Sequence, residues 1–499
     1  MRDRTAGILK SSRAPHIGRA WRCLAIVLGL GVNCGPNPET AHQEALSCLR
    51  TLAGNTARSD VQGDALLALG RLKDASALSG IKAALGSSQE DVAFKAVQAL
   101  EVVGGPEATA TLRECLNRNV NPFVKAQIVV SLHHLGDASG VPQIEAALGD
   151  STDVLRRSSA ASALGKVGDR SAIPRLTAVL LKDPEFMPRS SAAAGLGMLR
   201  DASALPALAQ ALREDPEPVV RISAVEAMTR IGGPVSLVEK AFLDQTNYQV
   251  RKALIAALED LKGGRAIFPA LRARFAQTGN TVERMLAAEA LGRLGDREAI
   301  PLLKSVLSAD ADEVVRLGAG EALARLGEPQ AMMAAVQGIL VGHDNDSFQN
   351  RAAEILAAYG DASVQVTFRR MIAWEGNPEL RRLCARGLGR IGERSSLIPL
   401  EKALENDGDE NVRIAAAEAL GNIPHREALR ALAKALTAGN QTADVRIAVV
   451  RALRVRGDRE ALGGLVKALH DEDARVRVEA AFSVLKVAKG IDVQQKNPS

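Results

Sequence analysis

Histidine and cysteine are the residues of this sequence that would be expected to hold a metal or attack a substrate. The seven histidines include no His-Glu pair, and His343 and His425 stand at expected loops or helix ends. Cys48, Cys115 and Cys384 are far apart and form no Cys-x-x-Cys pair, so neither a disulfide framework nor a zinc site is indicated. We therefore expect no catalytic residue set, no cofactor and no metal.

Arginine recurs at a nearly constant interval along the chain, and this row is its most regular polar feature. A row of this kind could bind a polyanion. Alternatively, each arginine could pair with an acidic residue at the adjacent turn and tie one repeat to the next. Recurrence in step with the repeat favours the structural pairing. The row includes Arg157, Arg189, Arg221, Arg251, Arg316, Arg381, Arg413, Arg446 and Arg477.

A second arginine group breaks a charge pattern near residue 380. In other repeats Glu precedes Arg by four residues, as in Glu226 and Arg230, which is the stabilising order on a helix. Here arginine takes both places, beside a tryptophan in an expected turn and several aromatic residues. Arginine with aromatics is typical of interface hot spots, although a diverged repeat with a solvated arginine face would look the same. The candidate partner-binding residues are Arg369, Arg370, Trp374, Arg382, Arg386 and Arg390.

The elements that must position these residues are copies of one unit. Fourteen copies begin their second helix at anchor residues spaced 30 to 33 positions apart. Leu stands eight residues and Ala four residues past most anchors, which places both on one helical face. A Gly-Asp step then closes the helix and caps the next, where proline follows. The anchors are Val61, Val92, Val124, Arg156, Pro188, Val220, Val250, Glu283, Val315, Phe348, Leu380, Val412, Val445 and Val476.

Repeated helix pairs of this length predict an all-α solenoid, in which each pair buries its apolar faces on its neighbours. With helices packed about 8–10 Å apart, fourteen pairs would form a curved rod on the order of 100 Å long. We expect the solenoid over residues 35–489 and a disordered tail over 490–499.

The net charge of +5 belongs to the first residues of the chain. Residues 1–34 hold six cations and one anion, and without them the chain has 57 basic and 57 acidic residues. A neutral body offers no global field for steering a polyanion. Nucleic-acid binding therefore ranks third among the functions considered.

The same leader predicts export. A basic region is followed by the ten apolar residues 23–32, which are too few to span a bilayer but suit a secretory signal. The stop at Cys34 resembles a bacterial lipoprotein signal, although Gly31 and Asn33 depart from its usual residues. The resemblance implies lipidation of Cys34 and a place in the cell envelope, either periplasmic or membrane-anchored. The alternative is a start codon assigned too early, ahead of a cytoplasmic protein.

Units such as VRISAVEAMTRIGG (220–233) and VRIAAAEALGNIP (412–424) resemble the HEAT-like repeats of the phycobilin-lyase type. The resemblance covers nearly the whole chain after the leader. It implies a right-handed superhelix of about fourteen two-helix repeats that binds another protein along its concave surface as a scaffold or adaptor. A bilin-lyase-type enzyme or accessory is the second interpretation. Only two Trp and two Tyr are present to line a tetrapyrrole groove.

Overall fold

The computed structural model describes residues 37–496, apart from 55–57, 118–120, 151, 278, 343, 375 and 458. Over these residues the chain is built from helices, and no strand occurs among them. The expected all-α solenoid is confirmed, with fourteen helix pairs following one another along the chain. None of the helices in the described part is long and apolar enough to span a membrane.

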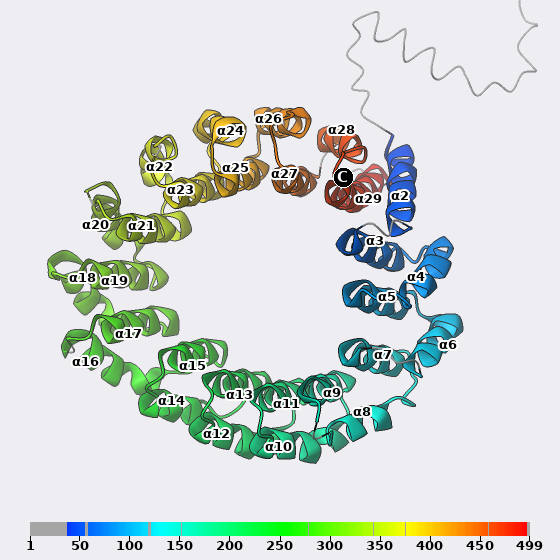
Figure 1. The fold of residues 1–499 in the computed structure, drawn as a ribbon. Coiled ribbons are helices and arrows are strands. Elements are labelled where there is room, and N and C mark those ends of the chain that lie inside the picture. The colour runs from blue at the N-terminus through cyan, green and yellow to red at the C-terminus, as the bar shows by residue number, and fades with distance from the viewer. Residues whose placement is uncertain are drawn as a thin grey trace, which may run out of the picture.

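The first helix of each pair lies on the outside (Figure 1). The outer helices are α2 (Pro38–Ala53), α4 (Leu78–Ala84), α6 (Gly105–Leu116), α8 (Val141–Ala147), α10 (Ile173–Lys182), α12 (Leu205–Glu214), α14 (Val235–Asp244), α16 (Phe268–Gln277), α18 (Ile300–Ala309), α20 (Pro329–Gly342), α22 (Gln365–Met371), α24 (Leu397–Asn406), α26 (Arg426–Thr437) and α28 (Arg459–Ala468).

The second helix of each pair lies on the inside and faces a central opening (Figure 1). The inner helices are α3 (Ser59–Arg71), α5 (Glu90–Val103), α7 (Pro122–His134), α9 (Val154–Val167), α11 (Phe186–Leu199), α13 (Pro218–Ile231), α15 (Tyr248–Asp260), α17 (Thr281–Leu294), α19 (Glu313–Arg325), α21 (Asp346–Tyr359), α23 (Pro378–Ile391), α25 (Glu410–Asn422), α27 (Ala443–Arg456) and α29 (Ala474–Lys496).

The expected Gly-Asp step closes several inner helices and starts the next outer helix through a short 3-10 turn. Gly168 ends α9 with a φ of 82°, the left-handed conformation that glycine adopts without steric cost. Asp169 then accepts a hydrogen bond of 2.9 Å from the Ser171 N–H. The 3-10 turns are η1 (Ala75–Ala77), η2 (Arg170–Ala172), η3 (Ala202–Ala204), η4 (Arg265–Ile267), η5 (Arg297–Ala299), η6 (Ala362–Val364) and η7 (Arg394–Ser396).

The row of arginines ties consecutive units together, which confirms the structural interpretation where the turn supplies an aspartate. Arg189 donates to both carboxylate oxygens of Asp215 at 2.7 and 3.0 Å, and also to the Asp183 carbonyl. Asp183 in turn accepts two hydrogen bonds from Arg157. Each turn is therefore bonded to the inner helix before it and to the one after it.

Aspartates elsewhere pair with arginines of the row in the same way, and we call these pairs the arginine ladder. Although burial opposes ionisation of Asp407, the hydrogen bonds from Arg381 hold the pKa of that carboxyl below its usual value. Where the turn has no aspartate at the equivalent place, the arginine loses this partner. The Nε atoms of Arg221 and Arg413 then lie buried without a hydrogen-bond acceptor. The row therefore serves packing between units, and most of its arginines already form hydrogen bonds within the fold.

Small residues bring neighbouring inner helices into backbone contact. A Cβ added to Gly165 would lie 2.4 Å from the Gly195 Cα, and one added to Gly389 would lie 2.5 Å from the Ala419 Cα. Carbon atoms normally approach to about 3.5–4.0 Å, so only glycine fits at these places. The glycines nine residues past an anchor that make such a contact are Gly70, Gly165, Gly197, Gly292, Gly389 and Gly421.

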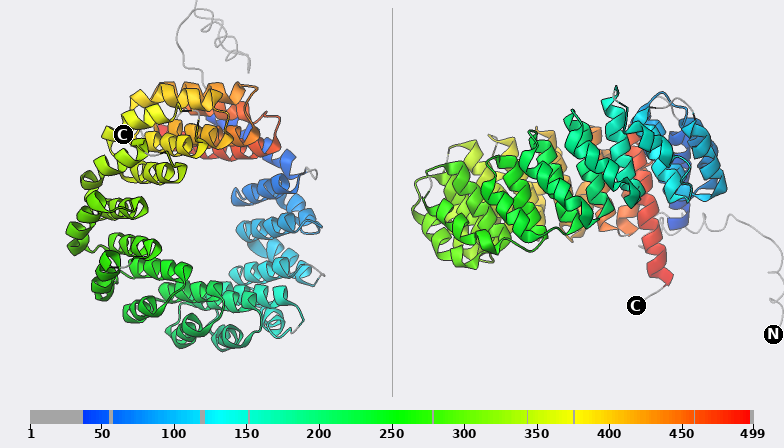
Figure 2. Two further views of the ribbon diagram at one scale, coloured as in Figure 1. Left: turned by 60° about the vertical axis from the view of Figure 1, so that its left-hand side comes forward. Right: turned by 90° about the horizontal axis from the view of Figure 1, so that it is seen from below.

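Tight packing of the inner layer turns every unit toward the centre, while the outer helices fan apart (Figure 1). The fourteen turns bring the two ends of the chain together, so the molecule is a closed ring (Figures 1 and 2). The chain therefore closes on itself and does not form the expected curved rod. The physical reason is curvature, because the small rotation from each unit to the next adds up over fourteen units to one full circle.

Helices from the two ends make the closing joint. The apolar face of α2 packs against α29, and the Cys48 thiol donates to the Leu469 carbonyl at 3.8 Å. Arg58 at the start of α3 lies 3.6 Å from the carboxylate of Asp473 at the start of α29. Open solenoids need polar caps on their terminal units, whereas here each end covers the other.

The expected signal segment lies outside the described residues, as does Cys34. Helix α29 continues to Lys496, and the disordered tail expected over 490–499 stays a prediction. One interior glycine at position 490 costs a helix only about 1 kcal/mol, and no proline interrupts the helix before Pro498. Helix α29 thus continues seven residues past the expected boundary at 489.

Candidate functional site on the inner face of the ring

The six residues expected to bind a partner fall into two groups. Arg382, Arg386 and Arg390 lie on the inner helix α23, at successive turns of the helix. Arg369 and Arg370 lie on the outer helix α22, and Trp374 lies in the turn that joins the two helices. Neighbours in sequence have thus been placed on different layers of the ring.

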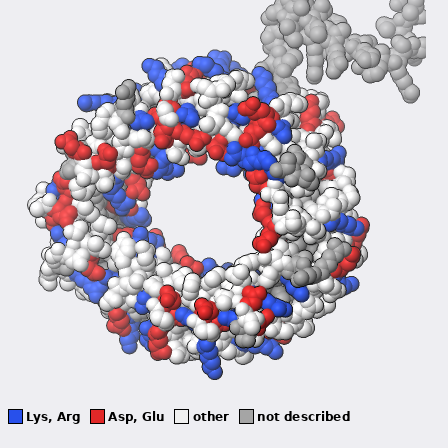
Figure 3. All heavy atoms as spheres, viewed as in Figure 1, with Lys and Arg blue, Asp and Glu red and all other residues white. Residues whose placement is uncertain are grey.

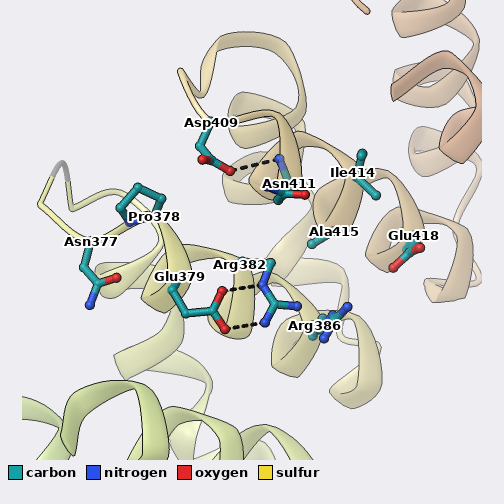
Figure 4. A pocket seen from close by; sticks show the side chains of 10 residues that line it. All are labelled: Asn377, Pro378, Glu379, Arg382, Arg386, Asp409, Asn411, Ile414, Ala415 and Glu418. Carbon is teal, nitrogen blue, oxygen red and sulfur yellow. Dashed lines mark hydrogen bonds and ion pairs between the residues drawn. The ribbon is translucent and has the colours of Figure 1, made fainter. Parts of the chain in front are cut away.

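Two cavities flank α23 on the inner face. One, of about 460 Å³, lies between α23 and α25, and Figure 4 shows the side chains that line it. The other, of about 600 Å³, lies between α21 and α23. Glu379, Arg382 and Arg386 line both cavities. These three residues form the wall that separates the cavities, and we call them with Glu418 the charged site.

Two of the three inner arginines are committed to the fold. Arg382 forms an ion pair with Glu379, one turn earlier, and this hydrogen bond lowers the pKa of the Glu379 carboxyl. Arg390 donates to the carbonyl oxygens of Ala357 and Gly360, which are left without partners where α21 ends. Arg390 therefore fastens α23 to α21, and its side chain also borders the second cavity.

Arg386 differs from both. Its side chain is exposed, and its guanidinium has no hydrogen bond or ion pair with any residue that the structure describes (Figure 4). The Glu418 side chain, at the equivalent place on α25, is also exposed and unpaired within that part of the chain. A guanidinium offers five N–H donors, and a carboxylate accepts through two oxygens. The charged site can therefore bind a partner that carries groups of both signs.

The second group lines a different cavity. Arg369 and Trp374 border a space of about 580 Å³ between the outer helices α22 and α24. Trp374 is 44% exposed, as its predicted place in a turn implied, whereas Phe368 is fully buried. The aromatic residues of this region therefore belong partly to the core. Arg370 is exposed and lines none of the three cavities described here.

Groups suited to metal binding do not gather in the described part of the chain. No three His, Cys, Asp or Glu residues there come close enough to hold a metal ion together. Burial raises the pKa of the Cys384 thiol, which fills the position that alanine takes in most units. The side chains of the charged site offer ion pairing and hydrogen bonding.

The regular arrangement behind these cavities was missed in the sequence. Residues one before, two after and six after an anchor line them, as Glu379, Arg382 and Arg386 do around Leu380. We call these three places in each unit the inner-face positions. Reading them unit by unit would have found the charged site, because Glu354 and Glu418 flank Arg386 at the same place in the adjacent units.

Comparison with known proteins agrees with this architecture. A family model described as HEAT repeats matches residues 49–133, 80–165, 121–196, 173–259, 235–324, 268–354, 366–442 and 398–486. No curated protein matches the chain.

Among solved structures, a crystal structure of importin beta is 13% identical, with 89% of this chain and 74% of that chain covered and a TM-score of 0.41. Yeast importin-beta is 12% identical, with coverage of 97% and 72% and a TM-score of 0.41. Human deoxyhypusine hydroxylase is 22% identical, with coverage of 52% and 99% and a TM-score of 0.23. Since the family model matches most of its length, this chain belongs to the HEAT-repeat family.

Proposed function

We propose that this protein is an exported, lipid-anchored scaffold that binds another protein along the inner, concave face of its ring. One observation carries the proposal: the Arg386 side chain stands exposed and unpaired, within the described residues, on the wall between two cavities. Arginine is enriched among the residues that dominate the energy of protein interfaces. An arginine held in place by its helix, with its side-chain hydrogen bonds unused, is suited to that role.

The partner expected at the charged site carries an acidic group for Arg386 and a basic group for Glu418. Charge complementarity of this kind sets the orientation of a partner and speeds its association more than it raises affinity. Affinity would come from the side chains that enter the two cavities. The Arg369 and Trp374 cavity, on the outer side, is a second place where the same partner could make contact.

Export and lipidation rest on the leader. If Cys34 is the lipid-modified first residue, only Gly35 and Pro36 separate it from Asn37, the residue that caps α2. An extended chain spans at most about 3.6 Å per residue, so this tether reaches about 10 Å. The ring would then sit directly against the membrane surface.

Co-purification from the native cell envelope tests the partner site. Arg386→Glu should reduce recovery of specific partners about tenfold, because the reversed charge repels the group that the arginine bound. Arg430→Glu, an exposed arginine on α26, is the matched control and should leave recovery unchanged. Equal recovery with Arg386→Glu and with wild type would refute binding at the charged site.

The anchor is tested separately. Palmitate labelling and processing that is sensitive to globomycin should be present in wild type and lost in Cys34→Ser. Full-length, unlabelled protein in the cytosol would overturn the export proposal and leave the partner site untouched.

A further inference from the structure

Apolar side chains form an exposed row across four consecutive inner helices. The residues just before the anchors of α7, α9, α11 and α13 are Phe123, Leu155, Met187 and Val219, and they are 43%, 45%, 38% and 43% exposed. Single exposed apolar residues are ordinary on a protein surface. Four at the same place in four adjacent units make a continuous patch, which we call the apolar row.

This row lies on the face that carries the cavities at the charged site. It occupies the first inner-face position, which Glu379 takes on α23. The other inner-face positions of α9 and α11 are the buried Ser158 and the half-buried Ser162, Ser190 and Ala194, so no charged side chain stands at these positions of the two helices. In Figure 3 the lower rim of the opening, over α9 to α13, is mostly white, and charged side chains gather on the other rims.

The row has definite ends and a charged border. Asp91 takes the equivalent place on α5, and Gln249 takes it on α15. Glu185 and Glu217, in the turns before α11 and α13, are exposed, and their carboxylates make no hydrogen bond or ion pair with the described residues. One edge of the apolar row is therefore acidic, and a basic group alongside it would be attracted.

Serine hydroxyls on this arc already form hydrogen bonds with one another. The Ser158 and Ser191 hydroxyls are 2.7 Å apart, and those of Ser190 and Ser223 are 2.8 Å apart. An extended peptide brings unpaired backbone groups that require donors and acceptors from the surface it binds. A helix forms its backbone hydrogen bonds internally and needs only apolar contact from the surface that binds it. The arc therefore fits a helix better than an extended chain.

We propose that the apolar row binds an amphipathic α-helix of the partner protein, with an apolar side chain at every seventh residue and Lys or Arg along the flank facing Glu185 and Glu217. Seven residues of helix rise about 10.5 Å, close to the 8–10 Å between packed helices, so each unit meets one apolar side chain. This inference rests on the proposed scaffold function and names the partner's chemistry.

The opening has room for such a helix. Fourteen inner helices spaced about 8–10 Å apart give a circle about 36–45 Å across at the helix axes. Removing about 10 Å for the inner helices themselves leaves about 25–35 Å, compared with 10–12 Å for the thickness of one α-helix and about 32 Å for the length between the first and last of four heptad-spaced residues. The helix can lie against α7 to α13, and the rest of the partner can reach the charged site across the opening (Figure 1).

Fluorescence anisotropy with labelled synthetic peptides tests the proposal on the folded ring. The probe is a helix of about 22 residues, about 33 Å long, which carries Leu at four positions spaced by seven and Lys beside each. A peptide of the same composition with the Leu positions scrambled is its control, and a proline-rich peptide with Leu at every third position tests an extended ligand. The heptad peptide should bind about tenfold more tightly than either.

Variants of the protein locate the binding. Leu155→Glu combined with Met187→Glu should weaken the heptad peptide about tenfold, because both place a charge in the apolar row. Val366→Glu, at a more exposed apolar position on the outer helix α22, should have no effect, and circular dichroism should show all variants folded. Arg386→Glu should also leave the peptide's affinity unchanged.

Three results would overturn the proposal: no binding of the heptad peptide, equal binding of all three peptides, or unchanged binding to the double variant. If the peptide fails while partner capture still depends on Arg386, the scaffold function stands and only the helical ligand is refuted.

Discussion

Replacing Gly389 with alanine should loosen the ring at the contact between α23 and α25. The new Cβ would stand 2.5 Å from the Ala419 Cα and 2.6 Å from its Cβ. Carbon atoms pack at about 3.5–4.0 Å, so the two helices must move apart by about 1 Å. Overpacking of this kind costs about 1–3 kcal/mol, whereas alanine in place of glycine in a helix gains about 1 kcal/mol. The net effect is destabilising by up to about 2 kcal/mol.

The same displacement changes the curvature. A shift of about 1 Å between inner helices, with about 10 Å between the layers, rotates one unit by about 6°. The joint between α2 and α29 lies three units further on, about 25 Å away across a ring about 40 Å wide, so this rotation opens the joint by about 2.5 Å. The variant should therefore show a larger maximum dimension in small-angle X-ray scattering, together with a lower urea midpoint.

Gly318→Ala is the matched control. It gains the same helical propensity on α19, but its nearest neighbours lie 3.7 Å from the new Cβ, an ordinary contact. This variant should be as stable as wild type or up to about 1 kcal/mol more stable, with unchanged scattering. If Gly389→Ala behaves like Gly318→Ala in both measurements, the inner glycines do not set the curvature and the reasoning is refuted.

Three further outcomes follow from the closing joint, the arginine ladder and the capped turns. Cys48→Arg places a cation in the joint between α2 and α29, so scattering should report an opened ring, whereas the exposed Ser47→Arg should not. Arg189→Ala should destabilise the protein by about 3–5 kcal/mol in urea denaturation because it leaves a buried carboxylate unpaired, and adding Asp215→Ala should recover part of that loss. Hydrogen bonds from Ser139 and Arg113 lower the pKa of Asp137 to about 2. The ionised Asp137 carboxylate therefore contributes fully to the free energy of unfolding above its unfolded pKa near 4, and this contribution is lost as the pH falls toward 2. Asp137→Asn should flatten the pH dependence of the urea midpoint in that interval.

The unit and its turns could be predicted because their causes are local. Gly168 and Asp169 fix the end of α9 and the start of the next turn within a few residues. The pairing of Arg157 with Asp183 was also within reach, because both recur with the same period. Local backbone rules act in the same way in every copy of the unit.

Ring closure could not be predicted from the same pattern. The rotation from one unit to the next is small, and any error in it is multiplied fourteenfold by the end of the chain. The accumulated error in rotation decides whether the two ends of the chain come into contact. It depends on contacts such as Gly165 against Gly195, where the backbones touch without an intervening side chain.

The candidate site was predicted in part. Arg386 does lie exposed on the inner face, but Arg390 is used by the carbonyls at the end of α21, which stand 33 and 30 residues away along the chain. Arg369 and Trp374 lie near α23 in sequence and on another layer in space. A short stretch of sequence contains both helices of one unit, so it does not show which residues belong to the inner layer and which to the outer layer.

Closure also bears on how such a chain can change its length. An open array can gain or lose a repeat at little cost, since a duplicated copy simply lengthens the stack. In a circle the number of copies is tied to the angle that each contributes, so thirteen or fifteen copies would have to readjust the angle at every junction. Duplication or deletion of one repeat therefore breaks the ring or strains every junction in it. Related proteins should keep fourteen repeats even where their surface residues differ.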